Sequence, residues 1–141
     1  MIVYLVRHAT AGHRASWEGD DDELRPLDDR GRRQAEGLVE LLGRREFERI
    51  VSSPAVRCVD TVAPLADSRG LTVEPSEALA ERAGREAALE LFRAATRPLV
   101  ASVHGDMVDE LTGGSAKKGS TTVLEVDENR VEVLERLPRQ A

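Results

Sequence analysis

Two short apolar runs, each ending in a histidine, constrain the fold of this chain more than any other feature. Residues 2–6 (IVYLV) lead directly into Arg7 and His8, and residues 98–103 (PLVASV) lead into His104. Continuous apolar runs of this length are typical of strands buried on both faces. In an open α/β sheet, ligands bind beyond the carboxyl ends of the strands. We therefore expect both histidines to lie at one edge of a sheet, in one site.

Strand and helix signals alternate along the rest of the chain. Further strand patterns occupy residues 49–51, 71–73, 120–126 and 131–137, the last two joined as a hairpin. Helix patterns begin near residue 27 and near residue 53, and cover residues 85–95 and 107–111. This order predicts an α/β fold, a three-layer α/β/α sandwich with a mixed, mostly parallel sheet. The 141 residues fit a single domain, 1–141, with a buried core.

The expected helix starts carry recognisable capping residues. Asp28 is the predicted N-cap of the first helix. Ser53-Pro54 predicts the start of the second helix, with Ser53 as the cap and Pro54 as the first helical residue. Pro64 lacks a backbone donor and predicts a kink or an early end there. Arg57 falls one turn into this helix, where it can reach an anion bound at the helix N-terminus.

Composition excludes several classes of protein. The chain has 20 basic and 26 acidic residues, a net charge of −6, so a nucleic-acid-binding role is not expected. Its single cysteine, Cys58, allows no internal disulfide, which suits a cytoplasmic location. The N-terminal apolar run is too short to cross a membrane, and no membrane association is expected. The acidic run at residues 20–23 is interpreted as a solvated face of a surface loop.

The residues expected at the sheet edge suit a tetrahedral anion. Arg7 and Arg57 supply planar donors that match phosphate oxygens, and a neutral imidazole such as His8 can attack phosphorus. Nearby guanidinium groups lower the pKa of an imidazole, which keeps it neutral at pH 7. Arginines placed in advance can stabilise the charge of phosphoryl transfer. No metal or other cofactor is therefore expected, and the three histidines lack metal-ligand spacing.

Four motifs in order resemble the histidine phosphatase (phosphoglycerate mutase-like) superfamily. They are Arg7-His8-Ala9-Thr10, Leu27-Asp28-x-x-Gly31-x-x-Gln34-Ala35, Ser52-Ser53-Pro54-x-x-Arg57 and Val103-His104-Gly105. The resemblance implies that His8 is the nucleophile and that Arg7, Arg57 and His104 bind the phosphoryl group. It also implies that Glu81, in Leu79-Ala80-Glu81, is the general acid. Thr10 and Gly105, which belong to these motifs, are expected to contact the substrate.

The short length most resembles SixA-type phosphohistidine phosphatases, which implies a phosphorylated protein as the partner. Three further segments resemble the phosphatase-like domain that follows a Nudix domain in some bacterial nucleotide hydrolases: Arg25 to Asp28, Val56 to Cys58 and Lys118 to Thr121. A phosphatase acting on nucleotides or other small phosphate esters is therefore the alternative. A catalytically inactive phosphate- or phosphoprotein-binding module also fits, because fold does not fix activity. A mutase is disfavoured because the chain lacks room for a closed site.

Overall fold

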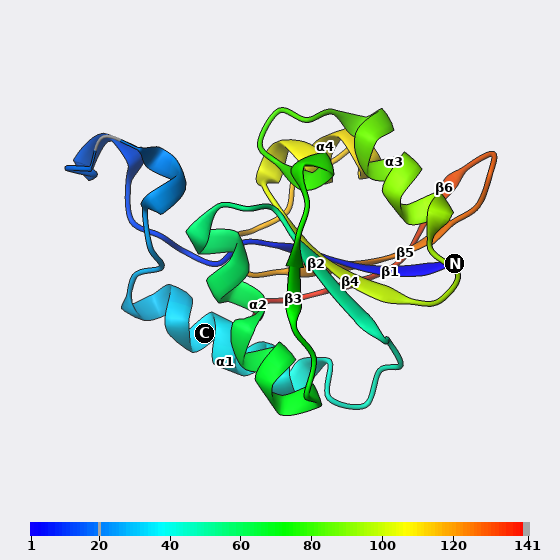
Figure 1. Cartoon of the computed structure of the whole chain (residues 1–141), viewed down its shortest axis with the longest axis horizontal. Helices are drawn as coiled ribbons and strands as arrows, with labels where there is room; N and C mark the ends of the chain where they lie inside the picture. Colours follow the sequence, from blue (N-terminus) through cyan, green and yellow to red (C-terminus); the bar gives the residue numbers. More distant parts are fainter. Residues whose placement is uncertain (20, 140–141) are drawn as a thin grey trace.

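The computed structural model describes residues 1–19 and 21–139, in which six strands form one mixed sheet ordered β3-β2-β4-β1-β5-β6 (Figure 1). The strands are β1 (Ile2–Arg7), β2 (Arg49–Ser52), β3 (Val73–Pro75), β4 (Leu99–Val103), β5 (Thr121–Val126) and β6 (Val131–Leu137). The first four run parallel, whereas β5 pairs antiparallel with β1 and β6 pairs antiparallel with β5. The predicted mixed, mostly parallel sheet is thus confirmed, and so is the terminal hairpin.

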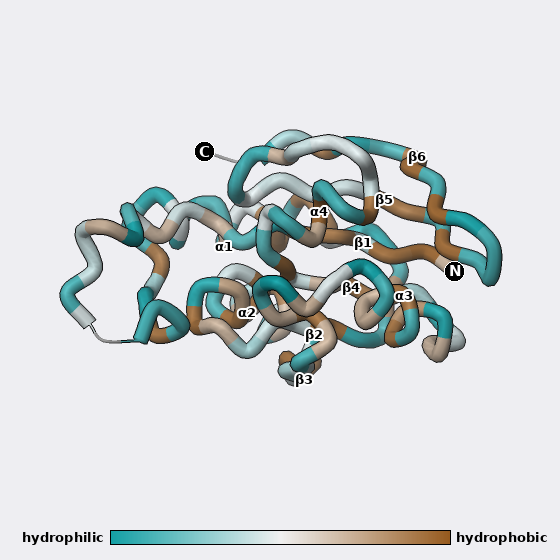
Figure 2. Tube along the Cα trace, turned by 90° about the horizontal axis from the view of Figure 1, so that it is seen from above, coloured by the Kyte–Doolittle hydropathy of each residue, from teal (hydrophilic) through white to brown (hydrophobic). Residues whose placement is uncertain are grey.

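Helices cover both faces of this sheet. α1 (Asp29–Leu41) and α2 (Val56–Arg69) lie on one face, and α3 (Arg85–Ala94) and α4 (Gly105–Thr112) lie on the other (Figure 1). Strand β1 contributes to both cores, since Val3 and Leu5 pack toward α3 and α4 while Tyr4 and Val6 pack toward α1 and α2. Figure 2 shows the resulting apolar stretches along β1 and β5. A strand buried on both faces has to be apolar throughout, which explains the first run of the sequence.

The register of β1 and β4 brings their carboxyl ends together. Val3 pairs with Leu99 and Arg7 pairs with Val103, so the residues that follow each strand are neighbours. β1 ends at Arg7, and the His8 backbone N–H donates to the Val103 carbonyl at 2.9 Å. This bond keeps His8 next to the end of β4, from which His104 follows.

The predicted start and end of the second helix were wrong. α2 begins at Val56 with Ala55 as its N-cap, and not at Ser53-Pro54. The Ser53 hydroxyl lies 2.8 Å from Nε2 of His104, and no side chain caps α2. The helix also continues through Pro64 to Arg69. Pro64 lies on the half-exposed side of the helix, and buried Leu65 beyond it keeps the last turns packed on the core.

Other boundaries differ by a few residues. β3 begins at Val73 rather than at Leu71. It lies at the edge of the sheet, where the missing N–H of Pro75 interrupts no pairing between central strands. Asp28 caps α1 as predicted, with its carboxylate accepting from the Gly31 N–H at 2.7 Å. The loop at 13–26 contains two 3-10 turns, η1 (Arg14–Ser16) and η2 (Asp22–Leu24), and η3 (Glu77–Leu79) follows β3. Asp20, part of the acidic run, lies outside the described residues.

Candidate active site

His8 and His104 meet where β1 and β4 end. Their ring centroids are 5.6 Å apart, with an interplanar angle of 69°. His8 is 7% exposed and His104 is 3% exposed, so both rings are buried. β1 and β4, which lead into His8 and His104, therefore place both imidazoles at one edge of the sheet.

The surroundings of His8 favour a neutral ring with one free nitrogen. Its Nδ1 lies 2.8 Å from the Ala9 carbonyl, which can only accept, so Nδ1 carries the proton and Nε2 keeps its lone pair. Burial lowers the pKa of His8 to about 3, and the charges of Arg57, His104 and Arg7 act in the same direction. The ring is therefore neutral at pH 7, which is the form that can act as a nucleophile.

Arg57 projects from the first turn of α2 and is 1% exposed. Its Nη1 donates to the Asp22 carbonyl at 2.9 Å, and its Nη2 lies 3.2 Å from the Asp22 carboxylate and 3.5 Å from Nδ1 of His104. Among the described residues, nothing accepts from the buried Nε of Arg57 or from that of Arg7. Since buried N–H groups are almost always bonded, these donors indicate a place for an anion.

Arg7 is the last residue of β1, and its side chain lies against Gly105 at the start of α4. Its Nη1 donates to the Ala116 carbonyl. A Cβ on Gly105 would stand 2.8 Å from the Arg7 guanidinium carbon. The missing side chain of Gly105 therefore leaves room for Arg7, and the expected substrate contact of Gly105 stays a prediction.

His104 is the N-cap of α4, but its side chain makes no cap bond and turns into the site. Its Nε2 lies 2.8 Å from the Ser53 hydroxyl and 3.6 Å from the Cys58 sulfur. Burial and the charge of Arg57 lower the pKa of His104. Ser53 was predicted only as a helix cap, so its contact with His104 was missed. The Ser52-Ser53-Pro54 motif was the available signal.

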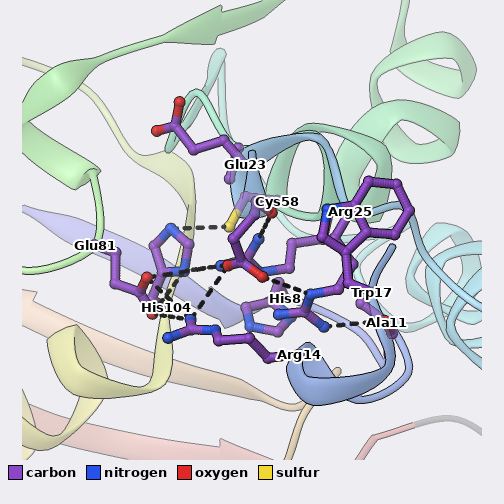
Figure 3. Close-up of polar contacts among 12 residues, drawn as sticks. His8, Ala11, Arg14, Trp17, Glu23, Arg25, Cys58, Glu81 and His104 are labelled. Atoms are coloured by element: carbon purple, nitrogen blue, oxygen red, sulfur yellow. Dashed lines mark hydrogen bonds and ion pairs between the residues drawn. The ribbon is translucent and has the colours of Figure 1, made fainter. Parts of the chain in front are cut away.

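Glu81 reaches the site from the loop after η3. Arg14 donates to both of its carboxylate oxygens, at 2.9 and 3.1 Å. The carboxylate also lies 3.8 Å from Arg57 and 4.0 Å from Nδ1 of His104 (Figure 3). Partial burial would raise the pKa of Glu81, but the bond from Arg14 and the surrounding charges hold that pKa below its usual value. The carboxyl group is therefore ionised at neutral pH, beside the predicted phosphate-binding residues.

Asp22 belongs to the candidate site, and the sequence analysis missed it. Its carboxylate accepts from Nε of Arg25 at 2.9 Å and pairs with Arg14 at 3.3 Å, besides its contact with Arg57. Arg25 is itself buried and donates to the Ala11 carbonyl. The interpretation of the acidic run as a solvated face was therefore wrong for Asp22. The signal was the presence of arginines on both sides of the run, which is common in surface loops and so carries little weight alone.

Thr10 is not brought into the cluster of Arg7, His8, Arg57 and His104. Its hydroxyl donates to the Asp28 carboxylate at 2.7 Å, and its backbone N–H donates to the Gln34 side chain at 3.0 Å. Both donors are occupied in fixing the turn after β1. Thr10 thus has a structural role, and the substrate contact that the motif implied stays a prediction.

Within residues 1–19 and 21–139, no three His, Cys, Asp or Glu side chains are grouped so that they could hold a metal ion. None of the helices in the same residues has the length and apolar character needed to span a bilayer.

The fold and the site together define an α/β protein with a basic anion site at its strand ends, and sequence comparison gives the family. The chain belongs to the histidine phosphatase superfamily (branch 1), whose family model matches residues 3–97. It is 33% identical over 150 residues to an 8-oxo-(d)GTP phosphatase of Mycolicibacterium smegmatis, an alignment that covers 92% of this chain. The chain spans about 45% of the length of that relative.

Solved structures with a similar fold include two SixA proteins. The protein histidine phosphatase SixA, solved with tungstate, superposes with a TM-score of 0.82 at 21% identity, over 98% of this chain and 97% of that one. A putative phosphohistidine phosphatase SixA from Agrobacterium tumefaciens gives 0.78 at 23% identity, over 96% of both chains. At these identities the likeness establishes the fold alone.

Proposed function

We propose that this chain is a phosphatase that works through a phosphohistidine intermediate on His8. One observation carries the proposal: a neutral, buried imidazole presents a free Nε2 beside two buried guanidinium N–H groups that have no acceptor among the described residues. A nucleophile next to preformed phosphate donors is what phosphoryl transfer requires. Family membership supports the same chemistry.

The first step transfers the phosphoryl group to the enzyme. The Nε2 lone pair of His8 forms a bond to phosphorus, and the bond from phosphorus to the leaving group breaks. The electron pair goes to the leaving atom, which takes a proton from Glu81 when it is a poor leaving group. A phosphate dianion beside Glu81 raises the pKa of the carboxyl group by like-charge repulsion, which favours the protonated form that this step needs.

The second step releases phosphate and restores the enzyme. Water attacks the phosphorus atom and gives a proton to the Glu81 carboxylate, while the nitrogen–phosphorus bond breaks and its electron pair returns to Nε2. Arg7 and Arg57 hold the phosphoryl oxygens in both steps, and His104 completes the donor set. Nδ1 of His8 keeps its bond to the Ala9 carbonyl throughout, which fixes the ring.

We infer that the substrate is a phosphohistidine displayed on a protein, as in the SixA proteins that this fold resembles over nearly its whole length. A phosphorylated imidazole needs little acid assistance to leave, and Glu81 is 37% exposed, so this wall of the site is open. A nucleotide is the second candidate. It is favoured by the 33% identity to the 8-oxo-(d)GTP phosphatase and by the position of Glu81, which suits an ester leaving group.

Trapping the intermediate tests the proposed reaction. Rapid acid-free quenching after mixing with a ³²P-labelled phosphohistidine protein should give alkali-stable, acid-labile label on wild type and none on His8→Ala. His13→Ala is the matched control, because His13 is an exposed histidine five residues further along. Absence of label on wild type, with phosphate binding intact, would identify a binding module instead. A panel of phosphohistidine protein, phosphate esters and nucleotides then assigns the substrate class by kcat/KM.

A further inference from the structure

The loop that carries Glu81 has an unusual backbone conformation. Arg82, the next residue, has φ of 66° and is the only residue other than glycine with positive φ in the described part of the chain. A side chain with a Cβ is disfavoured in this left-handed region, so the conformation requires a compensating contact. That contact lies on another element, because the Arg82 N–H donates to Oδ2 of Asp106 at 2.9 Å.

Asp106 belongs to the helix end that carries His104. It lies in the first turn of α4, two residues after His104. A bond from an N–H group to an ionised carboxylate is among the stronger hydrogen bonds in proteins. The start of α4 therefore holds both a phosphate-binding ring and the acceptor that fixes the residue after Glu81. Arg14 holds Glu81 only through its exposed side chain, whereas Asp106 holds the backbone.

We propose that Asp106 is a positioning residue, which sets the distance of the Glu81 carboxyl group from the reacting phosphate by holding the Arg82 backbone in its left-handed conformation. This inference rests on the proposed function, in which Glu81 protonates the leaving group. Proton transfer depends on a correctly placed group within hydrogen-bond reach. Loss of the Asp106 bond should therefore slow phosphoryl transfer to His8 only with substrates whose leaving group needs a proton.

Leaving-group dependence is the measurement that separates positioning from stability. Asp106→Ala should lower kcat/KM, which reports phosphoryl transfer to His8 and not the later hydrolysis, by about 10-fold or more with an alkyl phosphate and by less than about 2-fold with N-phosphoimidazole. Asp106→Asn keeps an acceptor oxygen and should resemble wild type with both substrates. Adding Arg82→Gly to Asp106→Ala should restore part of the lost rate, because glycine adopts positive φ without a Cβ.

A simpler role for Asp106 predicts a different pattern. A carboxylate in the first helical turn stabilises the helix through its charge, and it also raises the pKa of His104 against the effect of burial. Both effects are lost equally in the Ala and Asn variants. Equal losses in the two variants, or equal losses with both substrates, would overturn the positioning role. Glu110→Ala is the control for charge removal, since Glu110 is an exposed carboxylate on the same helix.

Glu81→Gln distinguishes failure of this inference from failure of the proposed function. If Glu81→Gln lowers kcat/KM for the alkyl phosphate but not for N-phosphoimidazole, Glu81 is the acid, and the Asp106 variants then test positioning alone. If Glu81→Gln affects neither or both substrates alike, the acid role fails and the inference fails with it. If Glu81→Gln shows the dependence and Asp106→Ala does not, only the positioning role is excluded. Urea unfolding of every variant confirms that the compared proteins are folded.

Discussion

The two halves of the site are held in different ways. His8, Arg57 and His104 are 7%, 1% and 3% exposed, and the ends of β1 and β4 and the first turn of α2 fix their backbones. The side chains of Arg14 and Glu81, which come from loops, are 52% and 37% exposed and are held mainly by their charges. Charge pairs in water contribute little and are screened by salt. We call His8, Arg57 and His104 the strand-end half of the site, and Arg14 and Glu81 the loop half. The reaction rate should therefore depend on the strand-end half, and the loop half should modify that rate.

Removal of the nucleophile is the largest change that this comparison predicts. His8→Ala should lower kcat by about 10³-fold or more, because no other imidazole in the strand-end half has its position. Steady-state turnover of a phosphohistidine protein measures the effect. Urea unfolding should show that the variant is folded. A variant that keeps a tenth of the wild-type rate would contradict the role of His8 and make the strand-end half no more important than the loops.

Arg57 tests the strand-end half without removing the nucleophile. Arg57→Met keeps the length of the side chain but removes the buried donors, and kcat/KM should fall by about 10²-fold. Arg33→Met is the matched control, since Arg33 is an exposed arginine on α1 and should change kcat/KM by less than about 2-fold. A loss below 5-fold for Arg57→Met would mean that the phosphate is held elsewhere.

The same comparison explains what the sequence could predict. Strand-end residues follow apolar runs whose length and composition specify buried strands, and parallel strands share one carboxyl edge. His8 and His104 could therefore be placed together from local pattern and topology. Glu81 was expected only through a family resemblance. No periodicity marks Asp22 or Ser53, because their contacts depend on how a loop closes over the site and on where a helix begins.

The buried histidines also predict how stability depends on pH. Burial lowers the pKa of His8 from 6.5 in the unfolded chain to about 3 in the folded protein. The unfolded chain therefore binds the proton first, and stability that is complete above pH 6.5 is lost as the pH falls toward 3. Between pH 7.5 and pH 5, His8 alone should lower the free energy of unfolding by about 2 kcal/mol, and the lowered pKa of His104 acts in the same direction.

Urea unfolding at the two pH values measures this loss, and His8→Gln is the control that should remove most of the His8 contribution. The ionised carboxyl groups of Asp22 and Asp28 have lowered pKa values, so their stabilisation is lost only as the pH falls below about 4. Protonation of these two carboxyl groups therefore does not obscure the change in unfolding free energy between pH 7.5 and pH 5. An unfolding free energy that is equal at pH 7.5 and pH 5 would show that His8 is not buried in its neutral form.

Arg14 tests the loop half. Arg14→Gln removes the ion pair with Glu81 and should lower kcat by about 5-fold or less at low salt, because exposed pairs contribute at most about 1 kcal/mol. The difference from wild type should shrink at 0.5 M salt, where such pairs are screened. Arg97→Gln is the control, since Arg97 forms an exposed pair with Glu48. A loss of 100-fold that is independent of salt would place Arg14 among the essential phosphate ligands.

Substitution of Thr10 should have the smallest effect on activity, and it tests where the strand-end half of the site ends along the chain. It follows the strand-end half in sequence, but its hydroxyl donates to Asp28 and not into the site. Thr10→Val should lower the free energy of unfolding by about 1 kcal/mol through the lost bond, while kcat and KM stay within about 2-fold of wild type. Asp28 still accepts from the Gly31 N–H, so α1 keeps its cap. A tenfold rise in KM with unchanged stability would instead support the substrate contact that the motif implied, and would extend the strand-end half by two residues beyond His8.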